Sequence, residues 1–214
     1  MTKIDILIPT YKRPDDLALV AKSIEDNTKH SFKVWFGLEK DDPEGLQAAL
    51  ATGHNALVNK YDLNYSNTIQ TLYEASTAPF ILHANDDFEF HKNWDEIPMS
   101  MFERKDLMVV GLRQTEGDNH GSAISLFRRK YIEKMSGCMD IPNRIFYPYN
   151  HNFVDTEFTQ TAQHRGVWAK CEPLVITHLH PGFTGKNKDA THRKNDDTVV
   201  LDQQTFESRR HLWS

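Results

Sequence analysis

Short apolar runs alternate with helically periodic segments along the first half of the chain. The runs at 3–9, 32–38, 56–58 and 80–82 have the length of strands. Between them, apolar residues recur at helical spacing at 17–24, 46–50 and 64–76. Asp15 and Asp16 precede the first helical segment, so one of them is predicted to cap it. Alternating strands and helices predict a parallel sheet with right-handed crossovers, whose ligands lie beyond the carboxyl ends of the strands.

The alternation is less regular after Trp94. Strands are predicted at 107–112, 123–127, 167–169 and 174–177. Helices are predicted to start at the basic triplet 128–130 and to span 154–163. Gly166 is predicted to end the second of these helices. The final segment ends in a helix that carries Leu201, Phe206, Leu212 and Trp213. The pattern shows neither an internal repeat nor an interdomain linker, so we expect a single α/β domain.

Composition narrows the class of protein. With 214 residues, 39% of them hydrophobic, the chain is long enough to bury one sizeable core. A net charge of -5 argues against polyanion binding through bulk charge, although a local basic patch could still contact phosphate. Cys138 and Cys171 are too few for a disulfide framework, and no apolar run resembles a signal peptide or a membrane span. We therefore expect a cytoplasmic protein without a membrane segment.

Polar residues with metal-binding chemistry directly follow the strand at 80–82. Asn85, Asp86 and Asp87 come where this strand is expected to end. Adjacent carboxylates repel each other unless a cation or hydrogen-bond donors accept them, and a ligand is the usual occupant at this edge of an α/β sheet. The alternative is an acidic turn, because Asn and Asp are common turn residues.

Two further pairs of residues have side chains that suit a metal site. Asp155 and Glu157 lie in the first turn of a predicted helix, and His178 and His180 follow a predicted strand. Carboxylates with imidazole suit a divalent metal that has open coordination positions, and strand alternation places both histidines on one face. Alternatively, the carboxylates complement the helix dipole and the histidines are surface residues.

The order and spacing of these motifs resemble one enzyme family over nearly the whole chain. The motifs are ILIPTYKRP, HANDDFEFHKNW, GSAISLFRRKYIEKMSG, YNHNFVDTEF and HRGVWAKCEPLVITHLHP, followed by KDATHRK and ESRRHLW. They resemble the inverting GT-A glycosyltransferases of family 2, and in particular a short phage-type and bacterial group. The resemblance implies an α/β GT-A fold with a mostly parallel central sheet and flanking helices. It divides the chain into a nucleotide-sugar-binding half (1–105), an acceptor-side half (106–181) and a C-terminal tail and helix (182–214).

The resemblance also implies roles for individual residues. Asp87, with His178 or His180, would hold Mn²⁺ or Mg²⁺ against the donor's diphosphate. Asp155 would be the general base, with Glu157 as the alternative base or as a residue that orients the acceptor. Binding of the nucleotide sugar, with uracil as the default base, is assigned to Pro9, Thr10, Tyr11, Arg13, Glu39, Asn67, Asn85 and Asp86. A flexible phosphate clamp is assigned to Lys186, Lys188, Arg193 and Lys194.

The acceptor hydroxyl is left open by the sequence. A hydroxylated base in phage DNA, a glycan and a protein are all compatible with the resemblance, and a phage enzyme would act in the host cytoplasm. The aromatic loop at 146–149 could stack on a sugar ring or a base. With DNA as the acceptor, Arg128, Arg129 and Lys130 are expected to contact phosphates. The alternative functions are a nucleotidyltransferase of similar fold and an inactive nucleotide-sugar-binding module.

Overall fold

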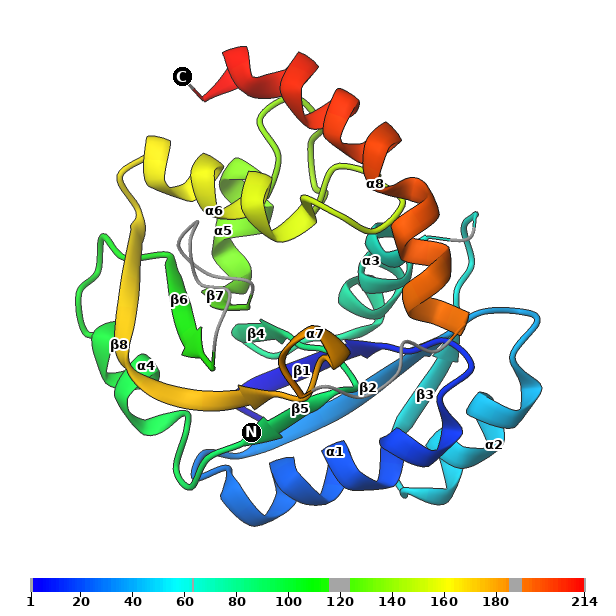
Figure 1. The fold of residues 1–214 in the computed structure, drawn as a ribbon. Helices are drawn as coiled ribbons and strands as arrows, with labels where there is room; N and C mark the ends of the chain where they lie inside the picture. Colours follow the sequence, from blue (N-terminus) through cyan, green and yellow to red (C-terminus); the bar gives the residue numbers. More distant parts are fainter. Residues whose placement is uncertain (1, 63, 116–123, 185–189, 214) are drawn as a thin grey trace.

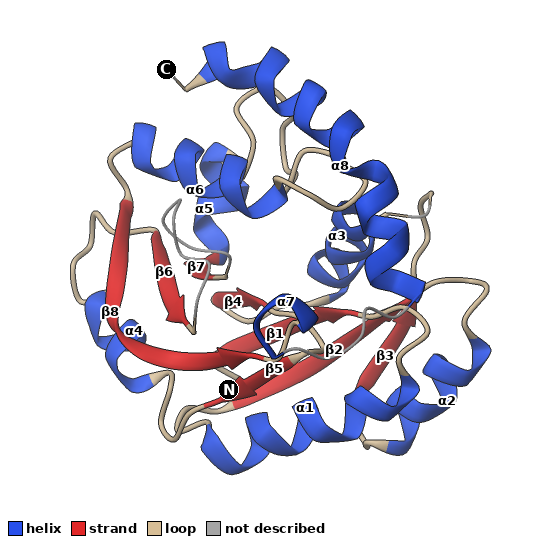
Figure 2. Cartoon of the chain, viewed as in Figure 1, coloured by secondary structure: helices blue, strands red, loops and turns tan. Residues whose placement is uncertain are grey.

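The fold is a mixed β-sheet with helices on both faces (Figures 1 and 2). The computed structural model describes residues 2–62, 64–115, 124–184 and 190–213. The described strands form one eight-stranded sheet in the order β3-β2-β1-β4-β7-β6-β8-β5. No described helix is long and apolar enough to cross a membrane.

The first half of the chain builds the parallel part of the sheet. The strands that pair in parallel here are β1 (Ile4–Pro9), β2 (Phe32–Leu38), β3 (Asn55–Val58) and β4 (Phe80–His83). The crossover helices are α1 (Pro14–Asn27), α2 (Pro43–Ala51) and α3 (Tyr65–Ala75). All of these elements were predicted from the apolar pattern. Because the four strands run the same way, their carboxyl ends share one edge of the sheet.

The second half adds antiparallel strands and the remaining helices. Its strands are β5 (Phe88–Phe90), β6 (Val109–Gln114), β7 (Ser125–Arg128) and β8 (Trp168–His178). β7 runs antiparallel to β4 and β6, whereas β6 and β8 are parallel. The helices are α4 (Glu96–Met101), α5 (Arg129–Met135), α6 (Val154–His164), α7 (Pro181–Thr184) and α8 (Ala190–Arg209), followed by a 3₁₀ turn at Arg210–Leu212.

Strand alternation divides the core into two layers. Ile6 and Ile8 of β1 pack with α1, whereas Leu7 between them packs with α3, α5 and α6 on the other face. Burial on both faces explains why β1 is apolar at every position except Asp5. Figure 1 shows α8 arching across the α3 and α6 side, opposite α1 and α2.

Three local predictions need correction. β5 and α4 were not predicted. β5 has only three residues and is defined by its pairing with β8, and α4 has only six, so neither shows a clear periodicity in the sequence. The strands predicted at 167–169 and 174–177 are one strand, in which Glu172 and Pro173 bulge out of the β6 ladder. Neither Asp15 nor Asp16 caps α1, which instead begins with Pro14 in the first turn.

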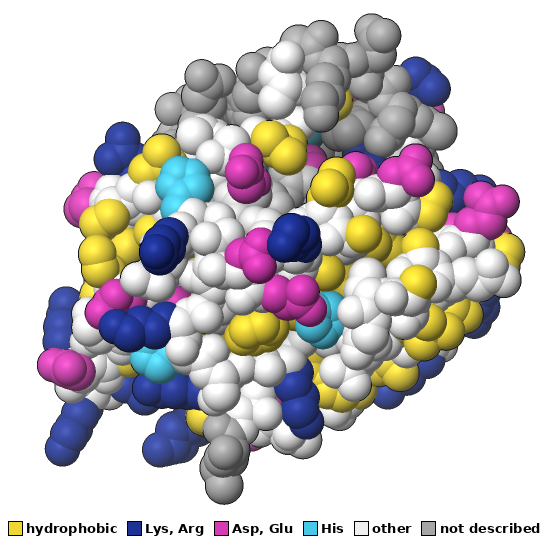
Figure 3. Space-filling model, turned by 90° about the horizontal axis from the view of Figure 1, so that it is seen from below, with side chains coloured by type: hydrophobic (Ala, Val, Ile, Leu, Met, Phe, Trp, Pro, Cys, Tyr) yellow, Lys and Arg dark blue, Asp and Glu magenta, His cyan; other side chains and the backbone are white. Residues whose placement is uncertain are grey.

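The basic triplet lies away from the carboxyl edge of the sheet. Arg128 donates to the carbonyl oxygens of Leu107 and Phe102, and Arg129 donates to that of Ala78, just before β4. These guanidinium groups therefore hold loops together at the amino end of β4. On the face seen in Figure 3, the described acidic and basic side chains are interspersed. The expectation that this triplet contacts DNA phosphates gains no support from its contacts.

Candidate functional site

A cavity of about 480 Å³ lies beyond the carboxyl ends of β1, β2 and β4. It is closed on its other sides by the starts of α3, α6 and α8 and by the end of β8. Most of the residues assigned from the sequence line it, namely Pro9, Thr10, Tyr11, Arg13, Glu39, Asn85, Asp86, Asp87, Asp155, His178 and His180. Folding thus gathers residues from distant parts of the chain around a single hollow.

Asp86 forms the buried floor beside the first loop. Its carboxylate pairs with Arg13 at 2.9 Å and accepts a hydrogen bond of 2.7 Å from the Thr10 hydroxyl. Burial raises the pKa of Asp86 to about 6, and the neighbouring charge of Asp87 adds to the rise, while Arg13 and Thr10 oppose it. Asp86 therefore orients the Arg13 side chain where the loop after β1 lines the cavity.

Asp87 and His178 form the candidate metal site. Their side chains approach to 3.2 Å between Asp87 Oδ2 and His178 Nε2, and the ring of His180 lies 5.4 Å from that of His178. Burial favours the neutral carboxyl, but the hydrogen bond with His178 and the charges of His178, Arg13 and His180 hold the pKa of Asp87 below its usual value. Within the described chain, the buried Oδ1 of Asp87 has no hydrogen-bond partner. An acceptor atom in this state suits a cation.

The candidate metal site offers few protein ligands. Among the described residues, no three His, Cys, Asp or Glu side chains are placed to share one ion. Mg²⁺ commonly takes only one or two protein carboxylates and completes its shell with water and phosphate oxygens. Asp87 with one histidine therefore fits an ion that is shared with a phosphorylated ligand better than a site made by the protein alone.

Glu39, directly after β2, is already bonded within the protein. Its carboxylate is 7% exposed and accepts hydrogen bonds from Asn59 and from the Thr68 hydroxyl. The predicted contact with a nucleobase would have to share this carboxylate with those donors. The Tyr11 hydroxyl donates to Asp41 at the exposed rim.

Asp155 enters the cavity from the first turn of α6. The helix begins directly after Phe153, which has a left-handed backbone (φ 67°), and Asp155 follows two residues later. The negative charge of this carboxylate is favoured at the amino end of a helix. The start of α6 therefore presents Asp155 to the cavity.

Tyr65 is a cavity residue that the sequence analysis missed. Its hydroxyl donates to Asn85 Oδ1 at 3.0 Å, and its ring packs edge-on against His151. Burial, followed by the charges of Asp155, Asp87 and Asp86, raises the pKa of Tyr65 far above its usual value, so it remains a donor. Asn64 caps α3 through its side chain, and this cap signal places Tyr65 at the helix start.

The remaining lining residues come from loops, from the starts of α3 and α6 and from α8. They are Asn64, Thr68, Asn150, His151, Asn152, Phe153, Val154, Thr191, Asp196 and Thr198. Of these, the run 150–152 was part of a quoted motif, but the sequence analysis assigned no role to it. The Thr191 hydroxyl donates to the carbonyl oxygen of Tyr11, which joins the start of α8 to the first loop.

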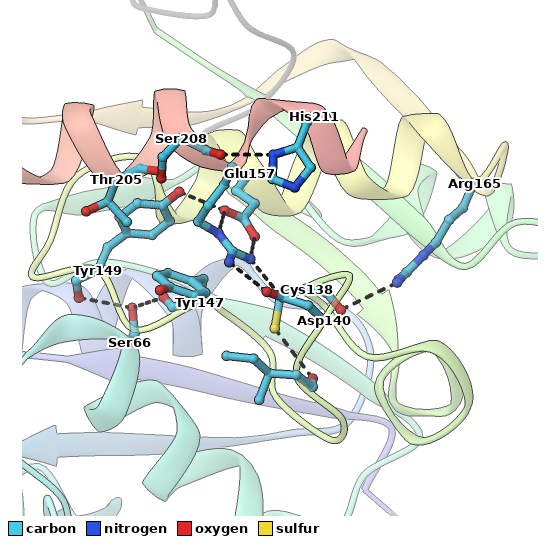
Figure 4. Close-up of polar contacts among 12 residues, drawn as sticks. Ser66, Cys138, Asp140, Tyr147, Tyr149, Glu157, Arg165, Thr205, Ser208 and His211 are labelled. Carbon is cyan, nitrogen blue, oxygen red and sulfur yellow. Dashed lines mark hydrogen bonds and ion pairs between the residues drawn. The ribbon is translucent and has the colours of Figure 1, made fainter. Parts of the chain in front are cut away.

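Glu157 and Asn67 do not line the cavity. The carboxylate of Glu157 is 1% exposed, accepts two hydrogen bonds from Arg209 and accepts a third from the Tyr149 hydroxyl at 2.7 Å. Figure 4 shows this group of side chains beside the end of α8. Asn67 donates to the carbonyl oxygen of Asp62 and accepts from Arg144. The contacts of both residues are those of structural anchors.

The structure argues against the predicted aromatic platform, whereas most of the predicted phosphate clamp lies outside the described residues. Phe146 and Tyr149 are 2% and 1% exposed, so these rings belong to the core and are not available for stacking with a ligand. Lys186 and Lys188 lie outside the described residues, as does the side chain of Lys194. Arg193 is exposed on the first part of α8.

Comparison with known proteins identifies the fold. No family model matches the sequence, and no curated protein matches it. Solved structures similar to this one include glucosyl-3-phosphoglycerate synthase from Mycobacterium tuberculosis with Mn²⁺, uridine diphosphate and glucosyl-3-phosphoglycerate, at a TM-score of 0.72 and 9% identity over 99% of this chain and 80% of that one. The same enzyme with Mg²⁺ and uridine diphosphate gives 0.69 and 10% over 99% and 79%. This similarity confirms the predicted α/β GT-A fold.

Proposed function

We propose that this protein is a metal-dependent, inverting glycosyltransferase that uses a uridine diphosphate sugar as its donor. One observation carries the proposal: Asp87, His178 and Asp155, from three separate parts of the chain, line the same cavity as Thr10 and Arg13. The similar synthase was solved with uridine diphosphate and Mn²⁺ or Mg²⁺, and with a uridine diphosphate glucose donor. The same donor class suits the cavity of this chain.

Binding of the donor is assigned to the β1 and β4 edge. Arg13, oriented by Asp86, is placed to contact the diphosphate through charge-assisted hydrogen bonds. Asp87 Oδ1 and a histidine of the 178–180 segment would hold Mn²⁺ or Mg²⁺. When bound, the ion supplies positive charge that stabilises the departing diphosphate.

Asp155 is assigned the role of general base. Its carboxylate takes the proton of an acceptor hydroxyl while that oxygen forms a bond to the anomeric carbon. The bond between the anomeric carbon and the diphosphate oxygen breaks in the same step, and its electron pair leaves with the diphosphate. A single displacement from the opposite face inverts the anomeric centre. Glu157 is not assigned this role, because its carboxylate faces Arg209 outside the cavity.

The proposal specifies the acceptor only as a molecule that carries a hydroxyl group. A hydroxylated base in phage DNA, a glycan and a protein remain the classes to compare. A screen of these acceptors with each donor, read by mass spectrometry of the product, decides between them. Transfer to DNA should also fall steeply with salt, because phosphate contacts release counterions.

The test of the proposed function combines donor hydrolysis with one substitution. Purified protein is incubated with a panel of nucleotide sugars and Mn²⁺ without acceptor, and we expect slow release of uridine diphosphate. Asp155→Asn should lower this rate by about 10²- to 10⁴-fold, the usual contribution of a general base. The Kd for uridine diphosphate with Mn²⁺, measured by calorimetry, should stay within about threefold of the wild-type value, because Asp155 is not assigned a contact with the nucleotide.

Two outcomes would contradict the proposal. Failure of the wild-type protein to release uridine diphosphate, while it binds the nucleotide, would indicate an inactive binding module. Release of pyrophosphate from a nucleoside triphosphate would indicate a nucleotidyltransferase. An Asp87→Asn variant serves as the control for metal binding and should lose Mn²⁺-dependent nucleotide binding.

A further inference from the structure

A buried carboxylate on α8 holds the loop that precedes Asp155. Asp202 is 1% exposed, and its two oxygens accept four hydrogen bonds. Oδ1 accepts from the backbone and side-chain nitrogens of Asn150, both at 2.9 Å. Oδ2 accepts from the backbone nitrogens of His151 and Asn152 at 3.0 and 2.8 Å. Three successive N–H groups turned toward one carboxylate form an anion-binding nest.

The same face of α8 contacts the chain on both sides of Asp155. Positions 202, 206 and 209 are spaced by four and three residues, so they share one face of the helix. Phe206 stacks on Phe153 with ring centroids 5.0 Å apart, and Arg209 binds Glu157. Asp202 therefore acts on the residues before Asp155, and Arg209 acts on the residue two positions after it.

The loop conformation that this nest fixes is one the chain would not adopt alone. Phe153 has a positive φ of 67°, a conformation that costs free energy for a bulky residue. The amide groups of residues 150–152 point to a carboxylate that lies 50 to 52 positions away in the sequence. Without that acceptor, these partly buried backbone donors would lose their partners and the loop would relax. Asn150, His151, Asn152 and Asp155 all line the cavity, so relaxation moves one of its walls.

We propose that Asp202 is a positioning residue for Asp155, which acts by holding loop 150–153 through the nest. The proposal rests on the proposed function, in which Asp155 is the general base. Asp202 is not among the residues that line the cavity, so it acts through the loop and not on the substrate. A base that is displaced by about 1 Å typically costs about 10²-fold in rate. The nest therefore controls the rate of the chemical step more than donor affinity.

The test is the Asp202→Asn substitution, which preserves the shape of the side chain. Its amide oxygen can still accept from one side of the nest, but its NH₂ group faces backbone donors on the other. We expect kcat for donor hydrolysis to fall by roughly 10- to 100-fold. The Kd for uridine diphosphate with Mn²⁺ should stay within about threefold, because the β1 and β4 edge is unchanged. Amide hydrogen exchange at 150–152 should become faster in the variant.

Asp5→Asn is the matched control. Asp5 is also 1% exposed, and its Oδ2 accepts from the backbone nitrogens of Thr77 and Ala78. It lies at the amino end of β1, whereas the cavity begins at Pro9 at the opposite end. Its loss should lower the melting temperature as Asp202→Asn does, but leave kcat within about threefold when both variants are assayed well below their melting temperatures.

The outcomes separate this inference from the proposed function. A wild-type enzyme that turns over, with an Asp202→Asn variant that matches its kcat despite a lower melting temperature, would overturn the positioning role alone. Equal losses of kcat in Asp202→Asn and Asp5→Asn would do the same, because they would reflect general destabilisation. A wild type without any turnover would overturn the proposed function, and with it the role of Asp155.

Discussion

Replacing Arg209 by methionine should destabilise the protein strongly. The side chains of Arg209 and Glu157 are 9% and 2% exposed, and the pair is joined by hydrogen bonds of 2.9 and 2.7 Å. Methionine leaves Glu157 with the Tyr149 hydroxyl as its only side-chain donor among the described residues. Removing one partner of a buried ion pair costs about 3–5 kcal/mol. At about 2–4 °C per kcal/mol for a chain of this size, the melting temperature should fall by roughly 6–20 °C.

The assay is urea unfolding followed by circular dichroism, with thermal unfolding alongside. Arg210→Met is the matched control, because Arg210 pairs with Glu207 at 62% and 52% side-chain exposure and should matter by less than about 0.5 kcal/mol. In the double variant Arg209→Met with Glu157→Gln, part of the lost stability should return, since no charge is left buried. A loss below about 1 kcal/mol for Arg209→Met, or equal losses for both arginines, would refute the reasoning.

Two further predictions concern the first loop and a close backbone contact. Arg13→Met should raise the pKa of Asp86 above about 6, because the guanidinium lowers it; carboxyl NMR titration of the metal-free protein measures this, and an unchanged value would contradict the assigned cause. Since the folded-state pKa of Asp86 exceeds its unfolded value of 3.8, the stability it contributes is complete below pH 3.8 and is lost as the pH rises through about 6. Gly137→Ala should cost about 3 kcal/mol or more, because a Cβ would lie 1.7 Å from the Ile145 carbonyl oxygen; Gly53→Ala, with φ +79° and open space, should cost only about 1–2 kcal/mol, and equal unfolding midpoints would refute the difference.

The apolar pattern was sufficient for most of the sheet and its crossovers. β1 and β2 are mostly apolar, interrupted only by Asp5 and Lys33, because most of their side chains are covered on both faces, and this makes them visible in the sequence. β5 was not visible, because three residues carry too little periodicity and the strand exists through its pairing with β8. The face of α8 that packs on the protein carries Asp202 and Arg209, so hydrophobic periodicity did not reveal how this helix is held.

The sequence by itself determined most of the charged groups that line the cavity and the strand ends that deliver them. Thr10, Arg13, Asp86 and Asp87 follow β1 and β4, whose parallel direction the pattern predicted, so these residues were expected at one edge of the sheet.

Only the tertiary structure decided between neighbouring candidates. Asp155 and Glu157 are two residues apart on a helix and so point about 200° apart, which allows only one of them to face the cavity. The resemblance favoured Asp155 but left Glu157 open, because local helix geometry alone does not choose between them. Arg209 of α8 makes the choice by binding Glu157 outside the cavity. Contacts between residues about fifty positions apart, and not local propensity, direct Asp155 into the cavity.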